Sequence, residues 1–309
     1  MRIKFFSSFC DSKQCKEKYE RLCEMHNNKN IFITTDEDYT HAIILNTAMP
    51  VLKIPKENVI GLAFEPPPYL KLTVEFIQYA QKYIGKYFIG DTLQFRLWSG
   101  VEGAVNLPDV FREHYAYIWH IQPLTYTPVK NKLMSIMVSD KKFAPGHKYR
   151  HVLVEHILKH RFPIDIYGTG AVRGAQRMAL LHKESLTYKE SLTYKEDPRL
   201  KGKFKELEPY ESYHFHICIE NFQTNAYFSE KITNTLLCGA TPIYLGCKNI
   251  LTYFPANVIV LSGDIVKDMS LLRDILLHPN KYKANINADS IKDKLNLLKN
   301  AEALFSPAT

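Results

Sequence analysis

The stretch that decides the fold spans residues 214–246 and reads HFHICIENFQTNAYFSEKITNTLLCGATPIYLG. Apolar and less apolar side chains alternate over its first six residues, a period of two that predicts a β-strand over 214–219. Ser229 is a natural N-cap for a following helix, and Gly239 suits the point where that helix ends. Residues 241–245 are short and apolar, as in a buried strand. The stretch therefore predicts a β-loop-α-β unit.

A unit of this kind is suited to binding an anion. Free backbone N–H groups and the positive end of the helix dipole point at the same place, just before the helix. Lys231, in the first turn of the predicted helix, adds a full positive charge there. The site therefore suits a phosphate group.

The same residues resemble a known enzyme family, the family 10 glycosyltransferases or α-1,3/4-fucosyltransferases. The family hallmark is Phe-Glu-Asn-Ser-Gln, then an aromatic residue, a Thr or Ser, and Glu-Lys, followed by an Ala/Gly-x-Pro-Ile/Val strand that ends in Gly. The positions that fit, in order, are Glu220, Asn221, Gln223, Tyr227, Ser229, Glu230, Lys231, Gly239, Pro242 and Gly246. Two positions depart from it, Ile219 for the usual Phe and Phe222 for the usual Ser. The likeness extends, more thinly, over about residues 60–283.

The resemblance implies an α/β protein with two Rossmann-like domains facing each other across a cleft, the GT-B arrangement. Residues 1–128 would bind the acceptor and carry the catalytic base, and residues 129–309 would bind GDP-fucose and finish with a closing helix. The implied reaction is an inverting, metal-independent transfer of fucose from GDP-fucose to a hydroxyl of a glycan acceptor, through an α-1,3 linkage and with no cofactor. Such an acceptor belongs to protein or lipid glycosylation.

The resemblance also assigns roles in the donor site. Glu230 would bind the ribose hydroxyls and Lys231 the diphosphate, with Asn221 and Tyr227 beside them. The alternative for a generic helix is that Glu230 is a favourable first-turn acid and Lys231 a solvated surface charge.

A second segment, residues 59–69, reads VIGLAFEPPPY. An apolar strand ends near Glu65, and three prolines then predict an extended exit. Ligands of open α/β sheets gather beyond the carboxyl ends of strands, and an ionised carboxylate there can take a proton from an acceptor hydroxyl. The family has a Glu-Ser-Pro or similar segment at this point, so the resemblance assigns the base to Glu65. A structural ion pair is the alternative.

A third segment predicts a strand over 133–138, a lysine-bearing loop and a helix over 149–160, which puts Arg150 in the first turn of the helix. Related enzymes carry an Arg there that clamps the donor diphosphate, and a guanidinium is suited to bidentate contact with phosphate oxygens. The resemblance therefore assigns Arg150 to the donor. Three lysines are alternatives for this role: Lys141, Lys142 and Lys148.

Further signals are weaker. Gly168-Thr-Gly170 predicts either a donor-site loop or a plain tight turn. Residues 185–190 recur as 191–196 and are interpreted as a duplicated surface loop. Because sugars stack on rings, candidates for the acceptor site are Tyr69, Trp98, Trp119 and His120. Two histidine pairs four residues apart, His147/His151 and His156/His160, lack an intervening carboxylate and are expected to be exposed.

Two other functions stay open. Asp36-Glu37-Asp38 matches the Asp-x-Asp motif of metal-dependent glycosyltransferases, so an enzyme using Asp36 and Asp38 is one alternative. The motif precedes the predicted strand at 42–45, whereas metal-binding carboxylates are expected to follow one, and this favours a polar turn. A non-catalytic sugar- or nucleotide-binding protein is the alternative from another class.

The bulk composition fits two cores. With 309 residues, 46% of them hydrophobic, two domains that meet near residues 125–130 are the easier division. The sequence contains no run of eighteen apolar residues, and its start is interpreted as a strand, which predicts a cytoplasmic protein of bacterial or viral type. The six cysteines lack metal-ligand spacing and are expected to be free thiols. Helical spacing over 291–304 predicts the closing helix.

The net charge of +8 suits an anionic donor. The lysines are dispersed among acids, with no RNA-binding signature, so no nucleic-acid partner is expected. Peripheral attraction to an acidic membrane that carries the acceptor stays open, and the sequence gives no oligomeric state.

Overall fold

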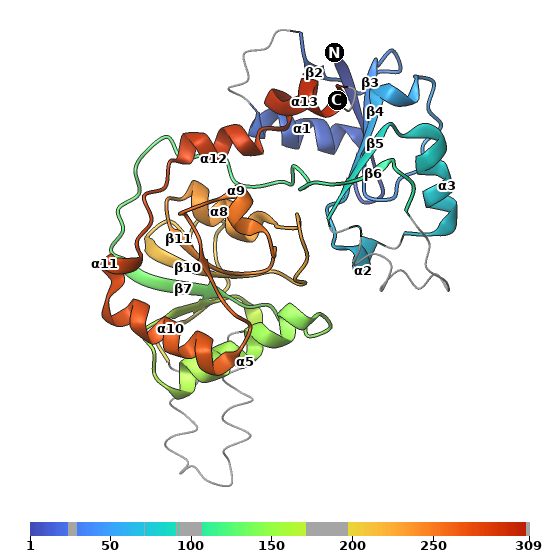
Figure 1. The fold of residues 1–309 in the computed structure, drawn as a ribbon. Helices are drawn as coiled ribbons and strands as arrows, with labels where there is room; N and C mark the ends of the chain where they lie inside the picture. The colour runs from blue at the N-terminus through green and yellow to red at the C-terminus, as the bar shows by residue number, and fades with distance from the viewer. Residues whose placement is uncertain (24–29, 71, 91, 93–106, 171–196, 307–309) are drawn as a thin grey trace.

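The computed structural model of the protein describes residues 1–23, 30–70, 72–90, 92, 107–170 and 197–306. Two parallel six-stranded sheets form two lobes (Figure 1), with strand orders β2-β1-β3-β4-β5-β6 and β12-β11-β10-β7-β8-β9. The predicted α/β class is thereby confirmed. The predictions for Trp98 and for the repeat at 185–196 lie outside the described residues.

The first sheet has one helix-covered core on each face. Its strands are β1 (Arg2–Ser7), β2 (Phe32–Ile33), β3 (His41–Leu45), β4 (Val59–Leu62), β5 (Lys86–Ile89) and β6 (Phe111–Glu113). The helices are α1 (Ser12–Leu22), the 3₁₀ turn η1 (Lys56–Asn58), α2 (Pro67–Leu70) and α3 (Val74–Tyr83). Alternate residues of β3 point to opposite faces: Ile43 packs with α1, and Ile44 packs with α3.

The second sheet is built in the same way. Its strands are β7 (Lys132–Met137), β8 (Asp165–Tyr167), β9 (Leu200–Gly202), β10 (Tyr213–Ile219), β11 (Thr241–Leu245) and β12 (Ile259–Val260). Its helices are α5 (Pro145–Lys159), α8 (Glu230–Leu237), α9 (Ile250–Tyr253), α10 (Ile265–Leu277) and α11 (Pro279–Tyr282). They are followed by α12 (Ala288–Leu295) and α13 (Leu297–Phe305), and α13 contacts the first sheet. Helices α5 and α10 cover one face, and α8 covers the other.

The β-loop-α-β unit predicted from the sequence is present. Strand β10 begins one residue before the predicted strand, and β11 has the predicted bounds. Ser229 is the N-cap of α8, with its side chain accepting a hydrogen bond from the backbone of Lys231. Gly239 follows the helix with a φ of 68°, the left-handed conformation that glycine adopts most readily.

Three local predictions are wrong. Helix α5 begins at Pro145, four residues early, because proline suits the first helical position; Arg150 therefore lies in the second turn. The three prolines do not continue as an extended segment, since the last two open the short helix α2. The C-terminal segment forms two helices, α12 and α13, and not one. Asn296 interrupts the helical segment and is the N-cap of α13, where its side chain accepts a hydrogen bond from the Lys299 N–H.

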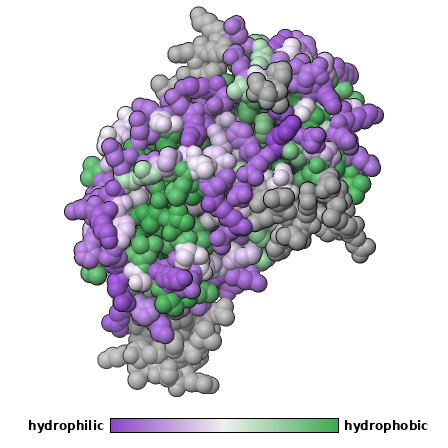
Figure 2. Space-filling view, viewed as in Figure 1, coloured by the Kyte–Doolittle hydropathy of each residue, from purple (hydrophilic) through white to green (hydrophobic). Residues whose placement is uncertain are grey.

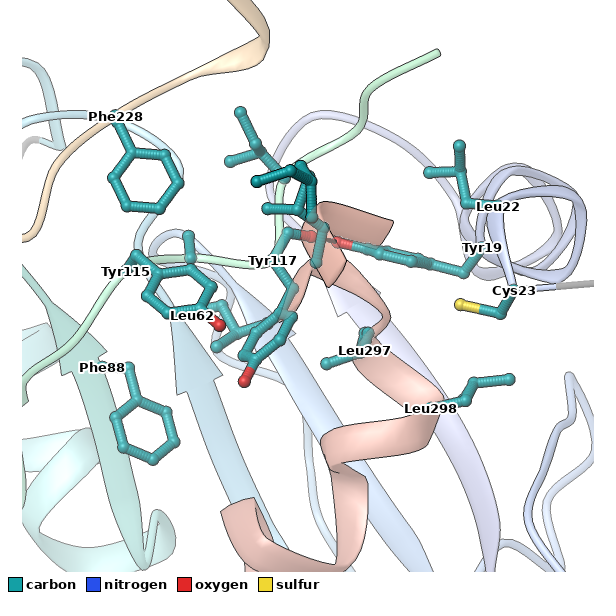
Figure 3. Close-up of a cluster of buried hydrophobic side chains, with 14 of the residues drawn as sticks. Tyr19, Leu22, Cys23, Leu62, Phe88, Tyr115, Tyr117, Phe228, Leu297 and Leu298 are labelled. Carbon is teal, nitrogen blue, oxygen red and sulfur yellow. Dashed lines mark hydrogen bonds between the residues drawn. The ribbon is translucent and has the colours of Figure 1, made fainter. Parts of the chain in front are cut away.

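One hydrophobic cluster is shared by the two lobes (Figure 3). The ring of Tyr115, on the connecting segment, stacks on Phe228 with centroids 5.1 Å apart. Helix α12 contacts α8 in the second lobe, and α13 contacts β4 in the first. The chain thus crosses between the lobes twice, and both crossings pack into the same cluster.

Hydrophilic side chains cover much of the viewed face, with a hydrophobic area on the second lobe (Figure 2). In the described part of the chain, no helix has both the length and the apolar character needed to cross a membrane. The six cysteines are free thiols, as expected from their spacing.

Candidate functional site

The site lies where β10 ends and where α5 begins beside it. The Gly146 N–H donates to the carbonyl of Asn221 at 3.0 Å. A Cβ at position 146 would lie 1.8 Å from the carbonyl oxygen of Glu220, a distance that no side chain permits. Glycine therefore allows α5 to approach the carboxyl end of β10. Through this approach Arg150 reaches the Asn221 side chain, with its Nη2 donating to Oδ1 at 2.6 Å.

Arg150 is a buried cation with an unused hydrogen-bond donor. The residue is only 7% exposed, and its Nε is buried without a hydrogen-bond partner among the described residues. Burial lowers the pKa of the guanidinium, against the opposing effect of the Glu220 and Glu230 carboxylates. A guanidinium nevertheless stays protonated at any physiological pH. Arg150 can therefore bind a further anion.

Lys231 supplies a second cation at the start of α8. Its Nζ lies 3.5 Å from Glu220 Oε2 and 3.0 Å from Glu230 Oε1, and it donates to Ser229 Oγ at 2.9 Å. Burial alone would lower the pKa of the ammonium, but the two carboxylates outweigh it and raise the pKa above its ordinary value. The Lys231 side chain is 18% exposed, so it is not a solvated surface charge. The Glu230 side chain is more exposed than that of Lys231. Desolvation alone would raise the pKa of its carboxyl, but Lys231 opposes this effect and the pKa is lowered.

Glu220 holds this arrangement together, and the sequence analysis gave it no role. Its side chain is fully buried and accepts from the backbone N–H of Ser229 at 2.8 Å and from its hydroxyl at 2.7 Å. It therefore fixes the first turn of α8 and faces Lys231. The signal that would have found it is the one used for Glu65, a lone carboxylate directly after an apolar strand.

Two cavities border these residues. One of about 70 Å³ touches Arg150, Glu230 and Lys231, so three of the expected donor residues share it. The other has a volume of about 380 Å³ and is lined by Met137, Val138, Ser139, Arg150, Gly168, Thr169, Lys203 and Phe204. It lies beyond the carboxyl ends of β7, β8 and β9, where ligands of parallel sheets bind. Arg150 borders both cavities.

The Gly168-Thr-Gly170 loop forms one wall of the larger cavity. Gly168 has a φ of 98°, and a Cβ there would lie 2.3 Å from the carbonyl oxygen of Val138. Gly170 would meet the carbonyl of Ser139 at 2.5 Å. The loop can approach the backbone of Val138 and Ser139, just after β7, because neither glycine carries a side chain.

Glu65 joins the site from the first lobe. It follows β4 and is exposed, yet desolvation by the protein around it raises the pKa of its carboxyl above the ordinary value. Lys231 partly offsets this rise, so a cation of the second lobe acts on a carboxylate of the first. Tyr227 is buried near the same groups, and burial, together with Glu220 and Glu65, raises the pKa of its phenol. The structure thus brings all six expected site residues together.

Other residues that the sequence offered as metal ligands or acceptor contacts make structural contacts instead. Asp36 and Asp38 both pair with Arg2, the first residue of β1, at the amino edge of the sheet and not at the carboxyl edge near Glu65. Trp119 packs edge-on against Phe9 and Phe64. His120 is buried against the carbonyl of Ile121.

The expectation that both histidine pairs are exposed is wrong for one of them. His147 and His151 are 3% and 9% exposed. His147 is buried because its ring accepts a hydrogen bond from the Ala144 N–H and so caps α5. The sequence shows the spacing of the pair but not that its helix begins at Pro145.

The comparisons agree with this geometry. A sequence model of glycosyltransferase family 10 (fucosyltransferase), C-terminal part, matches residues 127–276. This part of the chain belongs to glycosyltransferase family 10. The protein is accordingly a glycosyltransferase, and the resemblance seen in the sequence is confirmed. No curated protein matches the chain.

Solved structures resemble the chain over its whole length. An α1,3-fucosyltransferase with GDP-fucose is 13% identical with a TM-score of 0.50, covering 100% of this chain and 91% of that one. A mutant of the T4 phage BGT in complex with UDP-glucose is 9% identical with a TM-score of 0.50, covering 99% and 100%. At such identities the likeness concerns the fold, which is the expected GT-B arrangement.

Replacing Gly146 tests the close approach of α5 to β10. In an unconstrained helix alanine is preferred to glycine, so Gly146→Ala would stabilise the protein if nothing opposed the new methyl group. The contact with Glu220 predicts the opposite, a loss of about 1–3 kcal/mol in the free energy of unfolding, measured by urea denaturation. Val152→Ala, at a 40% exposed position of the same helix, should change it by less than about 0.5 kcal/mol. An unchanged or raised stability in Gly146→Ala would contradict the geometry.

Proposed function

We propose that this glycosyltransferase moves fucose from GDP-fucose to a hydroxyl of a glycan acceptor, with inversion, without a metal and through an α-1,3 linkage. The observation that carries the proposal is the pair of cations, Arg150 and Lys231, at the end of β10, together with the Glu65 carboxylate of the other lobe, on which Lys231 acts. A nucleoside diphosphate leaving group needs charge neutralisation, and its attacking hydroxyl needs a base. The site has groups for both.

Residues 129–309 would bind the donor. Lys231 and the first turn of α8 would meet the diphosphate together with the free donor capacity of Arg150. Asn221 would hold the guanidinium in place, and the exposed Glu230 carboxylate would accept hydrogen bonds from the ribose hydroxyls. Tyr227 would close the site from the side of Glu65. The cavity of about 380 Å³ beside Arg150 has room for the rest of the nucleotide.

Residues 1–128 would bind the acceptor and supply the base. The acceptor hydroxyl oxygen forms a bond to the anomeric carbon of fucose while its proton passes to the Glu65 carboxylate. On the opposite face, the bond from that carbon to the diphosphate breaks, and GDP leaves with the electron pair. Arg150 and Lys231 stabilise the charge that develops on the leaving group. Attack opposite to the leaving group inverts the configuration.

The first prediction concerns the donor. GDP at about 100 times its dissociation constant should stabilise the protein by roughly 2.7 kcal/mol, and Lys231→Ala should reduce that stabilisation because a diphosphate contact is lost. GMP should stabilise less than GDP. The measurement is the melting temperature with and without nucleotide, and Lys267→Ala, a lysine in the first turn of α10, is the matched control. Equal shifts with GDP in the wild type and in Lys231→Ala would exclude the assignment.

The second prediction concerns the base. Glu65→Gln keeps the size of the side chain but accepts no proton, so kcat should fall about 10²- to 10⁴-fold while GDP still binds. Only the ionised carboxylate is active, and its pKa in the free enzyme is raised, so the wild-type kcat/KM should decline as the pH falls through a value above the ordinary Glu pKa of about 4.3. Steady-state kinetics against pH measure both effects. A near-normal kcat in folded Glu65→Gln would place the base elsewhere.

The third prediction separates this mechanism from a metal-dependent one. If Arg150 and Lys231 neutralise the leaving group, transfer should continue in EDTA at nearly the untreated rate. The competing mechanism uses Asp36 and Asp38. It would be favoured if EDTA abolished activity, Mn²⁺ restored it and Asp38→Ala lacked it.

A further inference from the structure

The ring of Tyr69 in the first lobe lies between two rings of the second lobe. Its centroid is 5.5 Å from that of Phe143 and 4.9 Å from that of Phe222, with interplanar angles of 77° and 69°. Both contacts are edge-to-face, the geometry that aromatic pairs prefer. This aromatic clasp, defined here as Tyr69, Phe143 and Phe222, is separate from the shared hydrophobic cluster around Tyr115.

The clasp is rigidly connected to the carboxylate of the first lobe. Three prolines, residues 66–68, separate Tyr69 from Glu65, and each fixes its own φ. The N–H groups of Tyr69 and Leu70 both donate to the Pro66 carbonyl, at 2.9 and 3.2 Å. Leu70 is 3% exposed and anchors the turn in the core between the first sheet and α3. Tyr69 and Glu65 therefore belong to one stiff turn.

The other two rings belong to the segments that carry the donor-site residues. Phe222 directly follows Asn221. Phe143 lies just before α5, the helix that carries Arg150. Its ring packs edge-on against that of His147, in the first turn of α5, with the ring centroids 4.6 Å apart. A ring held between these segments therefore fixes the Glu65 turn relative to Asn221 and Arg150.

We propose that Tyr69 is a positioning residue for the transfer, and that the aromatic clasp sets Glu65 at its working distance from the bound donor. The proposal rests on the function proposed above. Tyr69 touches neither reactant in this role, and only its ring is used. Proton transfer and attack depend steeply on geometry, since a misplacement of about 1 Å can cost roughly 100-fold in rate.

The test compares two substitutions at Tyr69 with a control. Tyr69→Ala removes both ring contacts and should lower kcat roughly 10- to 100-fold, with the KM for acceptor and the Kd for GDP within about twofold of wild type. Tyr69→Phe keeps the ring and should restore kcat to within about twofold. Tyr83→Ala, a partly exposed tyrosine of α3 that also pairs with another ring, should leave all three values unchanged.

Amide hydrogen exchange provides a readout that needs no turnover. In Tyr69→Ala, exchange should become faster at residues 65–70, 143–147 and 220–223 together, because the clasp couples the three segments. Faster exchange at 65–70 alone would overturn the proposal, as would an unchanged kcat in Tyr69→Ala. A raised acceptor KM with normal kcat would assign Tyr69 to acceptor binding, and lost GDP affinity would assign it to the donor; either result overturns the clasp. If the wild type shows no transfer, the proposed function fails, and the exchange pattern alone decides whether the clasp exists.

Discussion

The burial of the Glu220 carboxylate is the constraint on which the rest of the site depends. Its backbone lies against Gly146, and a Cβ on Gly246 would come within 2.4 Å of its Cγ, so two glycines make room for it. A buried carboxylate is costly unless it is paired and hydrogen-bonded. Ser229 provides two hydrogen bonds and Lys231 provides the opposite charge. The start of α8 and its lysine are thereby fixed at the end of β10.

The same junction orients the second cation. Because α5 begins against the backbone of residues 220 and 221, Arg150 reaches Asn221, while its buried Nε meets no acceptor in the part of the chain that the structure describes. Two cations then border one small cavity, and the carboxylates of Glu220 and Glu230 act on both of them. The buried Nε of Arg150, which has no hydrogen-bond partner among the described residues, leaves a donor for an added anion. The family match and this arrangement of charges are the two grounds for the proposed nucleotide-sugar donor.

How far the sequence predicts this structure depends on whether an element is local. Strand β10, the Ser229 cap and the exit at Gly239 are encoded by neighbouring residues, so they were predicted correctly. Asn221, Glu230 and Lys231 lie in one motif, which is why the sequence alone could single them out as candidates. The start of α5 was misplaced because Ala144 lacks a capping side chain and His147 caps from inside the helix. The ring contacts of Tyr69 join segments about 75 and 150 residues apart, and no periodicity reveals them.

The most direct test of the central claim is a transfer assay with GDP-fucose and a panel of glycan acceptors, with GDP release quantified and the anomeric configuration of the product determined by NMR. The account predicts that GDP and a fucosylated glycan form in equal amounts, and that the configuration at the anomeric carbon is inverted relative to the donor. A product with retained configuration would contradict the role of Glu65 as the base. Transfer from a different nucleotide sugar, with GDP-fucose left intact, would contradict the donor assignment.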